Sequence, residues 1–91
     1  MIFELIFSNQ AKNDISDLKK SDSKAYKKLK NLLIEISNHP QTGTGKPKKM
    51  LHVYSGFYSR RITQKHRIVY SINETEVTVL IVSSKGHYDD K

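Results

Sequence analysis

Apolar residues recur at steps of three and four positions in two stretches near the start of the chain, which predicts two amphipathic helices. The first stretch predicts a helix over about residues 9–20, with Ser8 as its N-cap. The second predicts a helix that begins after the polar residues 21–23 and ends near residue 38, just before His39 and Pro40. The apolar positions that carry these two patterns are Ala11, Ile15, Leu18, Tyr26, Leu29, Leu32, Leu33 and Ile36.

Short runs rich in β-branched and aromatic residues predict the strands. These runs are residues 2–7, a weak run at 48–53, then 57–62, 66–72 and 76–83. Two of them, 57–62 and 66–72, flank a short polar turn and predict a β-hairpin. The run 76–83 is apolar on both alternating faces, so we expect it to be the central strand. The glycine-rich stretch 41–47 is expected to be a loop, because it lacks the Lys-Ser/Thr that completes a phosphate-binding P-loop.

A strand, two helices and then several strands predict an α+β fold, with two N-terminal helices packed on one face of a small, mostly antiparallel twisted sheet. At 91 residues, the chain is expected to be a single domain over 1–91. Alternation along 66–72 places Arg67 and Val69 on one face and Ile68 and Tyr70 on the other. If the helices cover Ile68 and Tyr70, Arg67 projects from the open face.

The positive charge is concentrated in the middle of the chain. The chain has 16 Lys and Arg against nine Asp and Glu, a net charge of +7. Residues 36–73 contain no acid at all, and their seven cations are Lys46, Lys48, Lys49, Arg60, Arg61, Lys65 and Arg67. A cationic segment with no internal partner is typical of a surface that binds a polyanion such as RNA. The lysines at 24, 27, 28 and 30 are interpreted instead as the solvated face of the second helix.

Composition excludes several classes of protein. The chain has no cysteine, which excludes disulfide scaffolds and thiolate metal sites and fits a reducing compartment. Its four histidines have no metal-ligand spacing with Asp or Glu, so we expect neither a metal nor a cofactor. The N-terminal apolar run is short and is interrupted by Glu4, and no later stretch reaches membrane-spanning length. We therefore expect a cytoplasmic protein with no membrane partner.

His87 and Tyr88 follow the last predicted strand and supply groups that the basic hairpin lacks. Histidine transfers protons near neutral pH, arginines hold phosphates, and tyrosine stacks on a base or moves a second proton. Together these groups suffice for RNA cleavage without a metal, in which a ribose 2′-hydroxyl attacks the adjacent phosphorus. An alternative is a non-catalytic RNA-binding or corepressor module, in which the same basic face binds RNA or an acidic protein partner.

Four motifs in this order resemble the Txe/YoeB family of toxins, within the wider RelE superfamily. They are G-T-G-K-P at 43–47, S-G-F-Y-S-R-R-I-T at 55–63, H-R-I-V-Y at 66–70 and H-Y at 87–88, and they span nearly the whole chain. The resemblance implies a fold like that of small microbial ribonucleases. It also implies a toxin of a type II toxin-antitoxin system, an mRNA interferase that cleaves mRNA in the ribosomal A site. The implied partners are the ribosome, its mRNA and a YefM/Axe-like antitoxin with an acidic segment.

The resemblance also implies roles for individual residues. Arg67, His87 and Tyr88 match the family's catalytic arginine, histidine and tyrosine, and Arg61 matches a second active-site arginine. Lys48 stands where the best-known members carry a glutamate general base, whereas RelE-type relatives use lysines in this region. The expected catalytic residues are therefore Lys48, Arg67, His87 and Tyr88, with the base left open between Lys48 and His87. The residues expected to bind RNA are Lys46, Lys49, Arg60, Arg61, Lys65 and His66.

Overall fold

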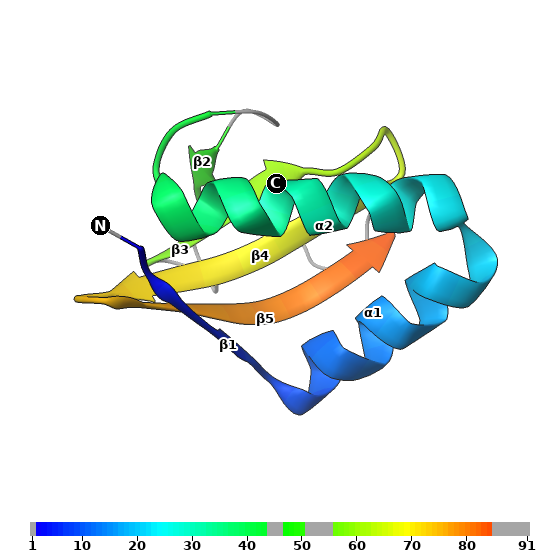
Figure 1. Ribbon diagram of the computed structural model, residues 1–91, viewed down its shortest axis with the longest axis horizontal. Helices are drawn as coiled ribbons and strands as arrows, with labels where there is room; N and C mark the ends of the chain where they lie inside the picture. The colour runs from blue at the N-terminus through cyan, green and yellow to red at the C-terminus, as the bar shows by residue number, and fades with distance from the viewer. Residues whose placement is uncertain (1, 44–46, 51–55, 85–91) are drawn as a thin grey trace.

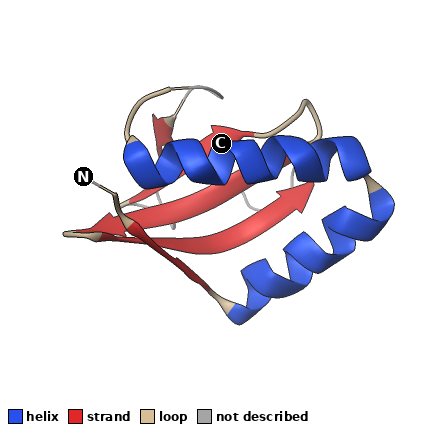
Figure 2. Ribbon diagram, in the orientation of Figure 1, coloured by secondary structure: helices blue, strands red, loops and turns tan. Residues whose placement is uncertain are grey.

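Two helices cover one face of a five-stranded sheet (Figures 1 and 2). The structure is a computed structural model, and it describes residues 2–43, 47–50 and 56–84. Its elements are β1 (Glu4–Phe7), α1 (Asn9–Ser21), α2 (Ser23–Asn38), β2 (Lys48–Lys49), β3 (Phe57–Arg61), β4 (His66–Asn73) and β5 (Glu76–Ser84). In the described part of the chain, no helix is both long and apolar enough to cross a membrane.

The strands lie in the order β1-β5-β4-β3-β2. Only β1 and β5 run parallel, and the other neighbouring pairs are antiparallel. This confirms the predicted α+β class and the hairpin. The prediction that residues 76–83 form the central strand is wrong, because β4 occupies the middle position and β5 lies between β4 and β1. Both strands are apolar on two faces, so hydrophobicity alone did not distinguish them.

The predicted helix starts are confirmed by their capping hydrogen bonds. The Ser8 hydroxyl accepts the backbone N–H of Ala11 at 2.9 Å, and the Asp22 carboxylate accepts that of Ala25 at 3.1 Å. The backbone N–H of Asp22 also donates to Leu18 O at 2.8 Å. Asp22 therefore ends α1 and begins α2, and the chain turns at this one residue.

The main core lies between the helices and the sheet. It is built from one apolar stripe on each helix and from the strand residues that face them, because alternate strand residues share a face. Ile68 and Tyr70 belong to this core and Val69 does not, as the alternation predicted. The fully or nearly fully buried members are Ala11, Leu18, Ala25, Leu29, Leu32, Ile36, Ile62, Ile68, Tyr70, Val77, Val79 and Val82.

The opposite face of the sheet is partly covered as well. Met50 and Val69 are buried there, with Phe57, Leu80 and Ile81 packed against them. The expectation of an open face is therefore wrong along the middle of the sheet. Burial on both faces is the reason that β4 and β5 lack a polar side.

The start of α1 takes the place of a strand beside the second half of β5, where β1 has already ended. Ser8 donates its N–H to Val79 O at 3.0 Å and its hydroxyl to Leu80 O at 2.6 Å. Further along, the Asp14 carboxylate accepts the N–H of Val82 at 3.0 Å. These bonds satisfy backbone groups that an edge strand would leave unpaired, and they hold the end of β5 in place.

A buried arginine joins α2 to the sheet. Arg60 has no exposed surface, and its guanidinium lies 3.0 Å from the carboxylate of Glu35. It also donates to the carbonyl oxygens of His39 at 3.0 Å and Pro40 at 3.1 Å, and to the hydroxyl of Tyr70 at 3.3 Å. These two carbonyls follow the last turn of α2, where a helix has no partners of its own for its final oxygens. Arg60, a residue of the sheet, therefore supplies hydrogen-bond donors to the chain just after the end of α2.

Side-chain hydrogen bonds and a glycine hold the loop after α2 close to Arg60. Gly43 has a φ of +114°, and a Cβ placed there would come within 2.8 Å of Glu35 Oε1. The side-chain amide of Gln41 donates to the Tyr58 hydroxyl at 2.8 Å. Burial raises the pKa of the Tyr70 hydroxyl above 10, so this group stays protonated and donates to Pro40 O. Only glycine fits both the conformation and the space at position 43.

We expect Arg60→Ala to lower the free energy of unfolding by about 3 kcal/mol, because it removes the ion pair with Glu35 and the donors to two carbonyl oxygens and opens a cavity in the core. Urea unfolding followed by circular dichroism measures the change. Arg61→Ala is the matched control, because Arg61 is the next residue and is exposed, and its change should stay within about 0.5 kcal/mol. Equal losses in the two variants would contradict a special role of Arg60 in stability.

Candidate functional site

Two arginines face each other across the β3–β4 hairpin on the side of the sheet away from the helices. Arg61 pairs directly with Arg67, and residues paired in this way have Cβ atoms about 4.5–5.5 Å apart. Among the described residues, neither side chain has an ion pair or a hydrogen-bond partner. Like charges placed directly opposite destabilise a sheet, and an anion bound between them removes that cost. The pair therefore has the properties of an anion-binding site.

Among the described residues, the acids on this face lie at the far end of the sheet. Glu4 pairs with Glu76, and Glu76 pairs with Asn73 at the end of β4. Arg67 and Asn73 are six residues apart on one strand, which is about 20 Å. Since this exceeds the screening length of about 8 Å at physiological salt, these acids do not neutralise the arginine pair.

Lys48 lies on the same face as the two arginines. It pairs with Ser59 in β3, and Ser59 and Arg61 are two residues apart and share a face. Lys48 and Arg61 are thus diagonal neighbours, which in antiparallel sheets are about 7–8 Å apart. Lys49 pairs with Tyr58 and faces the helix side. Both lysines are exposed, so the structure groups Lys48, but not Lys49, with Arg61 and Arg67.

Three of the predicted site residues, Lys46, His87 and Tyr88, lie outside the described residues. His87 and Tyr88 follow β5 in the sequence, and the described end of β5 can be placed relative to the two arginines. Ser83 of β5 pairs with Arg67, so this strand ends beside the arginine pair. The last described residues of β5, Ser83 and Ser84, therefore lie opposite Arg67 and His66.

Two predicted RNA-binding residues lie on the helix side of the sheet instead. For Arg60 the prediction is wrong, because its guanidinium is buried and bound to Glu35. The side chain of His66 lies 3.5 Å from the Asp22 carboxylate, at the junction of α1 and α2, and so is not grouped with Arg61 and Arg67. Lys65 is exposed in the turn of the hairpin. Charge counting along the chain did not reveal these positions, since Glu35 and Asp22 lie outside the acid-free segment.

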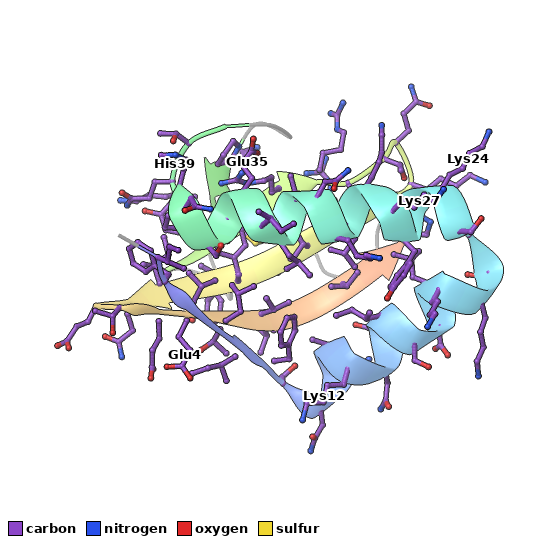
Figure 3. The ribbon with its side chains drawn as sticks, in the orientation of Figure 1. Glu4, Lys12, Lys24, Lys27, Glu35 and His39 are labelled. Atoms are coloured by element: carbon purple, nitrogen blue, oxygen red, sulfur yellow. The ribbon has the colours of Figure 1, made fainter. Side chains whose placement is uncertain are left out.

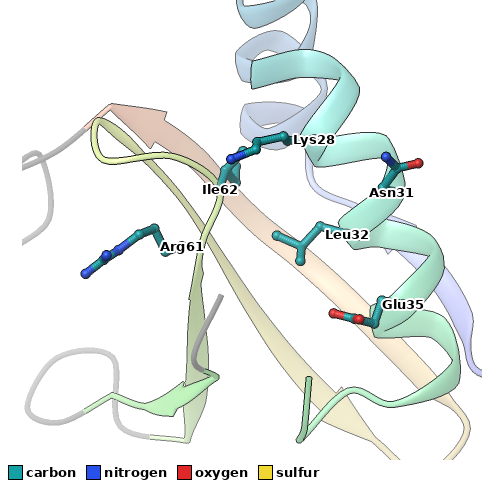
Figure 4. Close-up of a pocket in the computed structure, with 6 residues that line it drawn as sticks. All are labelled: Lys28, Asn31, Leu32, Glu35, Arg61 and Ile62. Atoms are coloured by element: carbon teal, nitrogen blue, oxygen red, sulfur yellow. The ribbon is translucent and has the colours of Figure 1, made fainter. Parts of the chain in front are cut away.

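A cavity next to Arg61, on the helix side of the sheet, was not predicted. It has a volume of about 250 Å³ and lies between α2 and β3 (Figure 4). Figure 4 shows Lys28 reaching from α2 toward Ile62, while Arg61 points away from the helix. The residues that line it are Lys28, Asn31, Leu32, Glu35, Arg61 and Ile62. The sequence offered one signal for this cavity, the polar residues spaced along α2. They include Lys28, which is among the lysines interpreted above as a solvated face.

Within the ranges that the structure describes, no three His, Asp or Glu side chains come together as a group able to hold a metal ion. The described site is instead a cationic surface built from β2, β3 and β4. Such a surface binds phosphates through guanidinium and ammonium groups, and guanidinium groups bind them in a bidentate manner.

Comparisons with known proteins place the chain in a family. Residues 7–88 match the family model of the YoeB-like toxin of bacterial type II toxin-antitoxin system. The chain is similar to Toxin YoeB of Escherichia coli strain K12, with 36% identity over 85 residues that cover 93% of this chain and 99% of that protein. Its fold is similar to that of a YoeB/ParE toxin from Agrobacterium tumefaciens, with a TM-score of 0.86, 26% identity and coverage of 94% of this chain and 100% of that one.

A second solved relative is seen with a partner. In the YoeB-YefM complex from Staphylococcus aureus, the matching chain has a TM-score of 0.79 and 34% identity, with coverage of 97% of this chain and 100% of that one. The family model and the curated relative each span most of the sequence, and both confirm the family that the motifs suggested. The chain belongs to the YoeB-like toxins of bacterial type II toxin-antitoxin systems.

Proposed function

We propose that this toxin is an endoribonuclease that cleaves mRNA in the ribosomal A site without a metal and so inhibits translation. The observation that carries the proposal is the pair of Arg61 and Arg67, which lie directly opposite each other and have no acidic partner among the described residues. A phosphodiester carries one negative charge, and its charge grows as the 2′-hydroxyl oxygen attacks the phosphorus. Two guanidinium groups fixed on neighbouring strands stabilise that growing charge more than they stabilise the substrate.

The reaction also needs a base and an acid. A base removes the proton of the 2′-hydroxyl, the new oxygen–phosphorus bond forms, and the bond to the 5′-oxygen of the next nucleotide breaks. An acid gives a proton to that leaving oxygen, which leaves a cyclic phosphate on one product and a 5′-hydroxyl on the other. In the proposal His87 is the acid, Tyr88 positions a base of the RNA, and Lys48 is a candidate for the general base.

The length of the chain allows His87 to approach the arginine pair. It follows Ser83 by four residues, so its Cα lies within roughly 14 Å of that of Ser83 even if the chain is fully extended. Because Ser83 pairs with Arg67, a catalytic histidine at position 87 is compatible with a phosphate held by the arginines. This reach supports the assignment of His87, which rests otherwise on the family motif.

A second candidate function is a non-catalytic RNA-binding or corepressor module. Lys48 favours it, because a lysine that stays protonated adds to the binding of an anion and removes no proton. The same three cations, Lys48, Arg61 and Arg67, then bind RNA or an acidic antitoxin and no bond is broken. Detection of new RNA ends separates the two functions.

We also propose a YefM-like antitoxin as the protein partner. The S. aureus relative was solved as a YoeB-YefM complex, and the cationic face of this chain is complementary to an acidic segment. An acidic segment that is disordered until it binds fits such a surface, since few apolar residues are needed to hold it. In this proposal the antitoxin and the RNA compete for the same arginines.

Expression of the chain alone should arrest growth and generate new 5′ ends within translated mRNAs. Arg67→Ala and His87→Ala should each lower the cleavage rate on the order of a hundredfold or more, because each removes a contact or a proton transfer of the transition state. Sequencing of RNA 5′ ends from cells at matched protein levels measures the effect. Lys12→Ala on α1, far along the chain from the hairpin, is the control and should cleave normally.

The same experiment separates catalysis from folding. Arg67→Ala removes one of two like charges that face each other, so it should leave the free energy of unfolding unchanged or raise it by up to about 1 kcal/mol. A variant that is as stable as the wild type and cleaves as fast would exclude Arg67 from the mechanism. Growth arrest without any new RNA ends would favour the non-catalytic module.

Substitutions of Lys48 test its role as a base. A lysine removes a proton only when it is neutral, whereas arginine stays protonated. If Lys48 is the base, the cleavage rate rises with pH and Lys48→Arg abolishes cleavage. If Lys48 acts only through its charge, Lys48→Arg keeps much of the activity and Lys48→Met loses it. Single-turnover cleavage of ribosome-bound mRNA measures both, and full activity of Lys48→Met would leave His87 as the base.

Binding of the antitoxin should weaken steeply as salt is added, because charge complementarity at an exposed surface is screened. Titration calorimetry at low and high ionic strength measures the change, and Arg61→Ala should reduce the dependence on salt. An affinity that is the same at both ionic strengths would show that the contact is mainly apolar, against the charge argument.

A further inference from the structure

Two hollows that share Lys28 lie along α2 on the helix side of the sheet, from Arg61 at the end of β3 to the start of the helix. The first is the cavity of about 250 Å³ that Arg61 and Ile62 line from the side of β3. The second is a more open hollow of about 500 Å³. The residues of the second hollow are Asp22, Lys24, Ala25, Lys27, Lys28 and Thr63. We call the two hollows together the α2 groove.

The cations of the α2 groove are not neutralised within the described part of the protein. Lys24, Lys27 and Lys28 are exposed and form no ion pair with any described residue. Both acids of the groove have other contacts: Glu35 binds the buried Arg60, and Asp22 caps α2 and lies 3.5 Å from His66. A ligand in the groove therefore meets a surplus of positive charge.

The positions of these lysines are unfavourable for the helix itself. They lie in the first two turns of α2, near the positive end of the helix dipole, where the first turn itself contains no acid and the acid at this end is the N-cap residue Asp22. Lys24 and Lys28 are four residues apart, so their like charges repel along one helix face. By contrast, Lys19 and Lys30 lie over the ring of Tyr26, 5.7 and 5.4 Å from its centre. The groove lysines have no such internal contact, and Figure 3 shows Lys24 and Lys27 at this end of α2.

We propose that the α2 groove is a second binding site for single-stranded RNA, which holds nucleotides next to the one whose phosphate lies between Arg61 and Arg67. The proposal rests on the proposed function, since it assumes RNA at the arginine pair. Arg61 lines the groove as well as the anion site, so an RNA strand that passes Arg61 meets Lys28, Lys27 and Lys24 in turn. Lysines on a surface of this kind bind phosphates and fix the position of the strand.

The floor of the groove offers contacts for a base. Leu32 is buried and belongs to the main core, and Ile62 lies beside it at the end of β3. Both side chains are nearly fully buried and present only a small apolar surface to the groove, while the amide of Asn31 is exposed on the same helix face and has hydrogen-bond donors and acceptors. An apolar floor with polar groups at its rim and cations beyond it suits a nucleotide better than an acidic peptide, whose carboxylates need only the cations.

The test measures binding without cleavage. The probe is a short single-stranded RNA with 2′-O-methyl groups, which lacks the attacking hydroxyl, and fluorescence anisotropy gives its affinity at several salt concentrations. The variant combines Lys24→Ala, Lys27→Ala and Lys28→Ala. The control combines Lys12→Ala, Lys19→Ala and Lys30→Ala, which removes the same net charge from exposed positions outside the groove.

We expect the groove variant to bind more weakly and to lose salt dependence. For single strands, the slope of log K against log salt changes by about 0.7 for each phosphate contact, so three lost contacts lower it by about 2. The control should keep the slope of the wild type. The groove variant should also unfold at the same or a higher temperature, because it loses unfavourable charges at the start of α2.

Equal slopes for the wild type and the groove variant would overturn the proposal, as would an equal loss in the control. A variant that binds the antitoxin less well but binds RNA as the wild type does would show a protein-binding groove and would also overturn it. These outcomes are independent of the proposed function, because the probe is not cleavable. Failure of cleavage in the wild type, with the expected change of slope, would count against the nuclease alone.

Discussion

The arrangement of the whole molecule depends on one buried guanidinium group. Arg60 satisfies a carboxylate on α2, two carbonyl oxygens that follow the helix and a tyrosine hydroxyl on β4. These bonds fix where the loop after α2 begins. That loop leads to β2, a strand of only two residues, whose pairing with β3 places Lys48 beside Arg61. The position of a candidate catalytic residue therefore depends on a contact buried on the other face of the sheet.

Two adjacent arginines have opposite roles because the strand is pleated. Arg60 points into the core and is neutralised by Glu35, so it stabilises the fold. Arg61 points to the other face and meets Arg67, which has the same charge. A buried unpaired charge is too costly to keep, whereas an exposed one costs little and remains ready for a ligand. The pleat thus separates a structural arginine from one that suits an anion.

The surface charge is placed where it destabilises the isolated protein. Arg61 repels Arg67 across the hairpin, and Lys24 repels Lys28 along α2 near the positive end of the helix. An anion on either surface relieves this repulsion. In the proposed function that anion is RNA or an acidic antitoxin, and each is bound partly because the free toxin holds like charges together. A surface of unpaired like charges therefore gains more binding free energy from an anionic partner than a surface whose charges are already paired.

The sequence by itself determined the features that depend on neighbouring residues. Periodicity defined both helices, polar residues predicted the N-cap at Ser8 and the start of the second helix near residues 21–23, and alternation placed Ile68 and Tyr70 on the opposite face from Val69. The motif resemblance identified the family. The tertiary structure decided what depends on residues far apart in the chain: the ion pair of Arg60 with Glu35, the parallel pairing of β1 with β5, and the groove between α2 and the hairpin. Local patterns carry no information on these contacts, because each is set by how separate elements pack.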